Sequence, residues 1–84
     1  MQPEAQVQVV ADETVRTRLV AAAIGLFARK GYAATTVREI VEAAGVTKPV
    51  LYYYFGSKEG IFHEVMREAL VEFEATIADA LAAP

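Results

Sequence analysis

One segment, TVREIVEAAGVTKPVLYYYFGSK at residues 36–58, restricts the possible folds of this chain more than any other. A first short helix is predicted over residues 37–44, because Thr36 and Glu39 have the spacing of a capping box. Gly45 follows this helix, and a glycine can adopt the left-handed conformation that ends a helix at little steric cost. The chain is therefore expected to turn sharply at Gly45.

A second short helix is predicted over about residues 47–54. Thr47 suits its N-cap, and Pro49 falls in the first turn, where the missing N–H costs nothing. Apolar residues lie five and one positions before the glycine and one and six positions after it, at Ile40, Ala44, Val46 and Leu51. This is the spacing of a helix-turn-helix motif. The side chains on the outer face of the second helix, where a recognition helix faces a DNA groove, are Thr47, Lys48, Val50 and Tyr53.

Helical periodicity extends to the amino-terminal side of this segment. Apolar residues recur at spacings of three and four from about Thr14 to Lys30, and Gly31 stands where such a helix would end. The predicted inner face is Leu19, Val20, Ala23, Ile24, Leu26 and Phe27. Tyr32 is expected to fill the core from the following loop. Gly25 marks either a close approach of another backbone or a tolerated position.

A fourth helix is predicted from its N-cap, Ser57, almost to the end of the chain. Its apolar stripe consists of Phe62, Met66, Ala69, Phe73, Ile77 and Ala80. The first two or three turns suffice to cover a three-helix head, so the apolar half from Leu70 onward lacks a partner and should contact a further domain or another chain. The predicted fold is all-α: a three-helix head with a helix-turn-helix plus the start of a longer fourth helix.

Charge is unevenly distributed along the chain. The formal net charge of −3 and the isoelectric point of about 5.0 would by themselves argue against nucleic-acid binding. Residues 14–63, however, contain seven basic and three acidic side chains, a net charge of +4, whereas the remaining residues contain one basic and eight acidic side chains, a net charge of −7. The middle of the chain can therefore face phosphates.

The composition argues against several other kinds of protein. The chain has no cysteine, hence no disulfide, thiolate nucleophile or cysteine zinc site. His63 has no partner at metal-binding spacing, and the acidic residues of the fourth helix form no catalytic constellation, so we expect no enzyme activity, cofactor or metal. The amino terminus lacks the features of a signal peptide, and no apolar stretch reaches the ~20 residues that span a bilayer. A cytoplasmic protein without membrane contact is expected.

A combined pattern of short elements covers about Arg16 to Phe62. Its parts are the paired alanines before Leu26-Phe27, then Gly31-Tyr32, Thr35-Thr36-Val37, Ile40, Ala44-Gly45-Val46, Leu51-Tyr52, Phe55 and Ser57-Lys58-Glu59. Together they resemble the amino-terminal domain of the tetracycline-repressor (TetR) family of bacterial transcriptional regulators. The combination is highly specific, although each element alone is weak. Two residues depart from the pattern: Val41 stands where alanine is usual, and Tyr54 where histidine is frequent.

The resemblance implies a homodimeric regulator, a repressor in preference to an activator, that binds a palindromic double-stranded DNA operator. It also implies a larger all-helical carboxyl-terminal domain, absent from these 84 residues, that dimerises and binds a small-molecule effector. The domains expected on this basis are a flexible amino-terminal arm at 1–12, a helix-turn-helix DNA-binding domain at 13–62, and a helix at 63–84 that leads to the absent domain.

The resemblance also carries over the residues that contact DNA. In similar proteins, bases are read by the residues that match Thr47, Lys48, Pro49, Val50 and Tyr53 in this chain. Phosphates are held by the residues that match Thr36, Tyr52, Tyr53 and Lys58.

The residues themselves leave other interpretations open. In these alternatives Lys48 contacts a phosphate alone or is solvated, Thr47 acts mainly as a helix cap, and Tyr52 belongs to the core. Lys58 can be an exposed lysine on a capped helix, although the free N–H groups at the start of its helix favour an anion site. The arginines expected on a solvated face rather than against DNA are Arg16 and Arg18. The alternative class of function is a helical protein-interaction module that uses the apolar face of the fourth helix.

Overall fold

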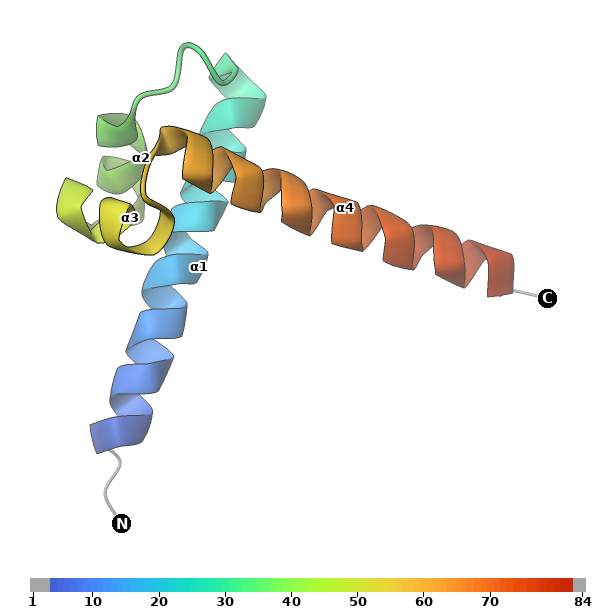
Figure 1. Cartoon of the computed structure of the whole chain (residues 1–84), viewed down its shortest axis with the longest axis horizontal. Coiled ribbons are helices and arrows are strands. Elements are labelled where there is room, and N and C mark those ends of the chain that lie inside the picture. Colours follow the sequence, from blue (N-terminus) through green and yellow to red (C-terminus); the bar gives the residue numbers. More distant parts are fainter. Residues whose placement is uncertain (1–3, 83–84) are drawn as a thin grey trace.

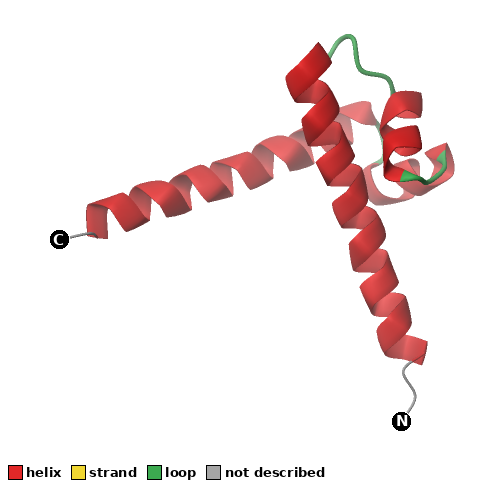
Figure 2. Cartoon of the chain, turned by 180° about the vertical axis from the view of Figure 1, so that it is seen from behind, coloured by secondary structure: helices red, strands yellow, loops and turns green. Residues whose placement is uncertain are grey.

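The computed structural model describes the backbone of residues 4–82 and the side chains of residues 14–82. Over this part of the chain it forms four helices and no strand: α1 (Glu4–Lys30), α2 (Val37–Ala44), α3 (Lys48–Phe55) and α4 (Lys58–Ala82). The carboxyl-terminal half of α1, α2, α3 and the first turns of α4 pack together as a head, and α4 crosses α1 before it projects away (Figures 1 and 2). The predicted all-α fold, a three-helix head with a longer fourth helix, is confirmed.

The first helix is longer than the sequence pattern predicts. It begins at Glu4, ten residues before the expected start at Thr14, so the described part of the expected arm, residues 4–12, is helical. No glycine or proline interrupts the chain between Pro3 and Gly25, and a helix propagates at lower cost than it nucleates. The apolar pattern used for the prediction marks only the part of α1 that packs in the head.

The hydrophobic core lies where the four helices meet. α1 and α2 contribute most of it, and α3 and α4 each bury one residue, Leu51 and Ile61. The buried apolar residues are Leu19, Val20, Ala23, Leu26, Ile40, Val41, Ala44, Leu51 and Ile61. α3 buries only Leu51 completely, and Val50, Tyr54 and Phe55 pack around it against the core.

Two residues expected in the core lie outside it. The side chain of Ile24 is 45% exposed, because it lies about 100° around the helix from the buried Ala23 and points past the core toward α4. Tyr32 is also partly exposed. Its ring packs at the edge of the head against Phe27 and Phe62, with centroids 5.6 and 4.8 Å away. Apolar spacing predicts which face of a helix is apolar, but it does not predict how much of that face the neighbouring helices cover.

Capping fixes the two ends of α2 as predicted. The Glu39 N–H donates to the Thr36 hydroxyl at 3.1 Å and the Thr36 N–H donates to the Glu39 carboxylate at 3.0 Å, which completes the capping box. At the other end Gly45 is left-handed (φ 75°), and the N–H groups of Gly45 and Val46 donate to the carbonyls of Glu42 and Val41. This is a Schellman motif, and it sets the direction in which the chain enters α3.

The corner between α3 and α4 is equally tight. Gly56 ends α3 with a positive φ of 81°, and the predicted cap on α4 is present, since the Ser57 hydroxyl accepts from the Gly60 N–H at 2.9 Å. A methyl group on Gly60 would overlap the carbonyl oxygen of Phe55. The two helices therefore meet at a point that has room only for glycine. Gly25 differs, because only the flexible Arg29 side chain lies near it and no other backbone approaches.

Beyond its first turns, α4 leaves the head with an exposed apolar face. Phe73 is 63% exposed, and every described residue from 69 to 82 is classed with the exposed surface. The large apolar side chains on this segment are Leu70, Val71, Phe73, Ile77 and Leu81. The prediction that this half of the helix has no partner among the residues described here is confirmed. None of the described helices is long and apolar enough to cross a membrane.

Candidate nucleic-acid interface

Leu51 holds the inner face of α3, where Tyr54 and Phe55 also pack against the core, and most of the remaining side chains of the helix face away from the head. Tyr53 is 82% exposed, and its ring packs edge-on against that of Tyr54, with centroids 5.0 Å apart. Tyr52 is 46% exposed and lies on the surface, so the alternative that placed it in the core is wrong. Val50 is half-buried and packs against the core, which leaves it only partly on the outer face.

The amino terminus of α3 is also exposed, at Thr47, Lys48 and Pro49. Thr47 has the extended backbone of an N-cap residue (φ −108°, ψ 163°), but its hydroxyl makes no capping hydrogen bond. The reason is local. A cap hydroxyl accepts from the second or third N–H of the helix; the second residue is Pro49, and the third, Val50, donates to the Thr47 carbonyl instead. The expected cap is thus formed by the backbone alone, which leaves the hydroxyl available to a ligand.

Lys48 and Arg29 differ from the other basic residues because they have no polar or ring partner among the side chains that the structure describes. The chain has eight lysine and arginine side chains, all of which lie among residues whose side chains the structure describes. Only Lys48 and Arg29 show no ion pair, hydrogen bond or ring contact within these residues. The engaged six are Arg16, Arg18, Lys30, Arg38, Lys58 and Arg67. Lys48 thus lies at the exposed start of α3 with no charge partner among the described residues.

The two arginines expected on a solvated face hold the head together instead. Nε of Arg18 donates to the carbonyl of Ala44 at 3.0 Å, where a cation also interacts favourably with the carboxyl end of α2. Arg16 pairs with Glu64 at 3.2 Å and lies over the ring of Phe55, 5.2 Å from its centroid. α1 thus uses one arginine to fix the turn after α2 and the other to fix the junction of α3 and α4.

Glu64 is the acidic centre of the second of these contacts. Its side chain is only 12% exposed and accepts from Arg67 at 2.6 Å as well as pairing with Arg16. The hydrogen bond from Arg67, followed by that from Arg16, lowers the pKa of Glu64 below its ordinary value of 4.5, although burial acts in the opposite direction. The ionised carboxylate therefore stabilises the folded chain.

We expect Glu64→Gln to destabilise the head by about 1 kcal/mol at neutral pH, the scale of a partly exposed ion pair. Because the pKa of Glu64 is lowered by folding, its contribution is complete above pH 4.5 and is lost as the pH falls through the folded-state pKa. Urea unfolding at several pH values should show the difference between the two proteins shrinking below pH 4.5. Glu59→Gln, at an exposed carboxylate, is the control; a difference that stays constant with pH would contradict this role.

Thr36 and Lys58 form a second group of predicted contact residues. This group lies at the start of α2, at the opposite end of that helix from the turn that leads to α3. Thr36 is exposed at the start of α2, and its hydroxyl is part of the capping box. Lys30 pairs with the same Glu39 carboxylate, and this hydrogen bond is the main reason that the pKa of Glu39 is lowered. Nζ of Lys58 lies 2.9 Å from the carbonyl of Thr35, the residue before Thr36. The predicted contact residues thus divide between α3 and the starts of α2 and α4.

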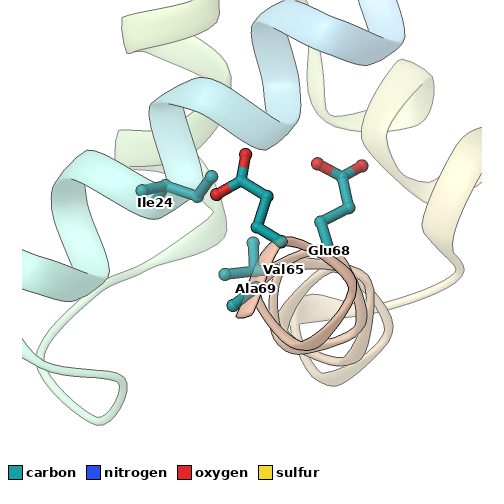
Figure 3. Close-up of a pocket in the computed structure, with 5 residues that line it drawn as sticks. Ile24, Val65, Glu68 and Ala69 are labelled. Carbon is teal, nitrogen blue, oxygen red and sulfur yellow. The ribbon is translucent and has the colours of Figure 1, made fainter. Parts of the chain in front are cut away.

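A pocket of about 190 Å³ lies between α1 and α4, away from α3. Figure 3 shows Ile24 of α1 opposite Val65 and Ala69 of α4, with two glutamate carboxylates beside them. The glutamates are Glu68 and Glu72. Carboxylates repel phosphate, so this pocket does not belong to a nucleic-acid surface. Among the described residues no group of three histidine, aspartate or glutamate side chains is placed to hold a metal ion.

Two short helices that meet at a left-handed glycine, the second with an exposed face, define a helix-turn-helix module, the class of domain found in many transcriptional regulators. The comparison with known families gives the particular group. Residues 19–65 match the family described as bacterial regulatory proteins, tetR family, and the chain belongs to this family. Proteins of the family are regulators of transcription and not enzymes, as the sequence pattern predicted.

Several curated relatives are named HTH-type transcriptional regulators or repressors. The HTH-type transcriptional repressor KstR2 of Rhodococcus jostii is 48% identical over 52 residues, which cover 62% of this chain and 26% of that protein. The regulator BetI of Vibrio campbellii is 36% identical over 69 residues, covering 82% and 35%. The repressor BdcR of Escherichia coli is 39% identical over 62 residues, covering 74% and 32%. The chain thus spans about a quarter to a third of these relatives' lengths. No solved structure matches it significantly.

Proposed function

We propose that this chain is the DNA-reading head of a transcriptional repressor and that α3 lies in the major groove of duplex DNA. The observation that carries the proposal is Lys48, a basic side chain without a polar partner in the described part of the protein, at the exposed start of a helix whose other face is fixed in the core. Six of the eight basic side chains interact with other groups of the protein. The ammonium group of Lys48 is by contrast available to pair with an anionic ligand.

Base recognition is assigned to the first turns of α3. An ammonium group at the front of a helix in the major groove can reach O6 or N7 of guanine, and we assign this contact to Lys48. The free hydroxyl of Thr47 is suited to a phosphate or a thymine methyl group, and Pro49 offers an apolar surface beside it. Val50 contributes only its exposed part. Tyr53, the most exposed side chain of α3, is assigned to both base and phosphate contacts.

Phosphate contacts would fix the register of the head on DNA. Tyr52 and Tyr53 can donate their phenolic hydroxyls while their rings remain on the head. At the start of α2, the N–H groups of the first turn beside Thr36 have no partner within a helix and can approach a phosphate. These contacts lie on either side of the glycine turn, so the arrangement depends on how α2 and α3 are held.

The rest of the regulator is proposed from α4 and from the length of the relatives. We propose that residues 13–62 form the DNA-binding domain and that 63–84 lead into a carboxyl-terminal domain, which would cover the exposed apolar face of α4. That domain would dimerise the protein and bind a small-molecule effector in the cytoplasm. Two heads would then meet a palindromic operator with half-sites about one DNA turn apart, ~34 Å.

The exposed face of α4 also supports a second candidate, a protein-interaction module in which the helix-turn-helix is only a scaffold. The two candidates differ in their response to salt. Neutralised phosphates give an affinity for duplex DNA that falls steeply with added salt, whereas a module directed only at proteins does not bind DNA even at low salt. The deciding experiment is selection of duplexes from a random pool at moderate salt. Recovery of a common sequence supports the regulator, and this sequence should be a palindrome when the selection uses a longer chain that includes the proposed dimerising domain. Recovery of no sequence, with no binding at low salt, rejects it.

Lys48→Ala is expected to weaken binding to the selected duplex about tenfold or more, since a good base contact discriminates by about 1–3 kcal/mol. It should also relax base preference at one position without unfolding the helices, because the side chain is exposed and forms no hydrogen bond or ion pair with the described residues. The measurement is a binding titration against duplexes that differ at single positions.

Tyr53→Phe should weaken binding to all duplexes equally if the Tyr53 hydroxyl contacts only phosphate.

Arg29→Ala is the matched control for Lys48→Ala. It removes the same charge from the other basic side chain without a described partner, but it lies at the carboxyl end of α1. Base preference should be unchanged in this variant. If Lys48→Ala lowers the affinity by the same factor for every duplex, Lys48 contacts phosphate and does not read bases.

A further inference from the structure

The ammonium group of Lys58 makes several contacts within the protein, which a lysine that binds phosphate would not need. Its ammonium group donates to the carbonyls of Tyr32 and Thr35, both at 2.9 Å, and lies 4.2 Å from the centroid of the Tyr32 ring. Two of the three N–H donors are therefore used by backbone carbonyls, and the ring face provides a cation–π contact. A phosphate at the start of α4 would have to compete with these interactions.

The contacts of Lys58 join segments that are far apart in the sequence. Lys58 is the first residue of α4, and its partners belong to the loop at residues 31–35 that connects α1 to α2. Figure 2 shows this loop as the bridge from the end of α1 to the start of α2. The lysine therefore ties α4 to the connection that leads into the helix-turn-helix.

The loop is held from its other side by the core of the head. Thr35 is fully buried, and its hydroxyl donates to the Gly31 carbonyl at 2.8 Å, with the Leu26 carbonyl 3.3 Å away. The ring of Tyr32 packs against Phe62 on the next turn of α4. With the core on one side and Lys58 on the other, the loop is held between α1 and α4.

We infer that Lys58 is a positioning residue that holds this loop, and with it the first turn of α2 at Thr36, rather than a phosphate ligand. The inference rests on the proposed function in that the position of α2 matters through DNA binding. Thr36, the residue after Thr35, is the cap of α2, so a shift of the loop moves the N–H groups proposed to approach a phosphate. Lys58 thus acts on DNA through α2.

The test compares Lys58→Met, which keeps the side-chain stem and removes the donors, with Tyr32→Leu, which removes the ring and leaves the lysine charge. Binding of the full chain to the selected duplex is titrated at several salt concentrations, at a temperature where circular dichroism shows each variant folded. We expect each variant to lose roughly tenfold in affinity, the scale of one hydrogen bond to a charged group, and the double variant to lose little more.

The dependence of affinity on salt separates positioning from direct contact. A lysine that neutralises a phosphate contributes about 0.9 to the slope of log affinity against log salt, so its removal lowers the slope by that amount. A positioning role leaves the slope of Lys58→Met unchanged while affinity falls. A slope lowered by about 0.9, or wild-type affinity in the folded Lys58→Met variant, would overturn the inference.

Amide hydrogen exchange gives a readout that does not involve DNA. The Thr35 N–H donates to the Tyr32 carbonyl at 3.2 Å, the same carbonyl that accepts from Lys58. Exchange at Thr35 and Thr36 should accelerate in Lys58→Met while that of the α1 core is unchanged. Unchanged exchange in the loop would overturn the inference even if DNA binding were lost. A wild-type chain that binds no duplex would reject the proposed function, while accelerated exchange would still support the role of Lys58 in holding the loop.

Discussion

Replacing Gly60 with alanine is expected to unfold a large part of the head at temperatures where the wild-type chain is folded. The added methyl group would overlap the carbonyl oxygen of Phe55, a backbone atom that cannot rotate away, so α4 would have to move relative to α3. Overpacking of this kind costs about 1–3 kcal/mol and occasionally more. A head of this size rarely has more than about 3–5 kcal/mol of stability. The change should appear as a lower midpoint in urea unfolding followed by circular dichroism.

Gly25→Ala provides the matched control for Gly60→Ala. Gly25 is also helical, but an added methyl group there meets only the end of the Arg29 side chain, at 3.4 Å. Because alanine favours a helix interior over glycine, this variant should gain about 0.5–1 kcal/mol. If Gly60→Ala is as stable as the wild type, the corner between α3 and α4 is less tightly packed than the structure indicates.

Leu51→Ala is the second substitution with a large expected effect. Leu51 is fully buried and is the only residue that α3 contributes to the buried core. Truncation of a buried leucine to alanine costs about 2–5 kcal/mol, through lost burial and the remaining cavity. α3 should therefore detach or the head should unfold, and DNA binding should disappear together with the cooperative unfolding transition. Thermal unfolding and a binding titration on the same sample measure both effects.

The same chemical change at Leu70 tests whether burial is the cause. Leu70 lies on the exposed part of α4 and is 57% exposed, so Leu70→Ala should change stability by no more than about 0.5 kcal/mol. Equal losses in the two variants would mean that the second half of α4 is covered in solution. A folded Leu51→Ala protein that still bound DNA would show that α3 is held by contacts other than its buried leucine.

Short-range features of this fold were predictable because their partners lie close in the sequence. The capping box needs only Thr36 and Glu39, and the left-handed ends at Gly31 and Gly45 follow from the conformational freedom of glycine. The position of Leu51 on the inner face follows from its spacing. The absence of a side-chain cap at Thr47 could also have been predicted in part, because Pro49 has no N–H that could donate to the Thr47 hydroxyl.

The positions of charged and partly exposed side chains depended on contacts between distant segments. Arg18 and Ala44 are separated by 26 residues, as are Lys58 and Tyr32, and helical periodicity contains no information about such pairs. Gly60 lies close to Phe55 in the sequence, but their contact depends on the angle at which α4 leaves α3, and helical periodicity does not give this angle. A family pattern identifies Lys58 as a recurrent residue, but the three-dimensional structure shows which atoms surround it.

The projection of α4 gives the molecule an electrical polarity. From residue 64 to 82 this helix carries five acidic side chains and one basic side chain, a net charge of −4, and it points away from the head. A polyanion would repel that end and attract Lys48 at the start of α3, so the long-range field would orient the protein before contact. Encounters would then tend to begin with the reading surface foremost, and added electrolyte would slow the capture of DNA as well as weaken it.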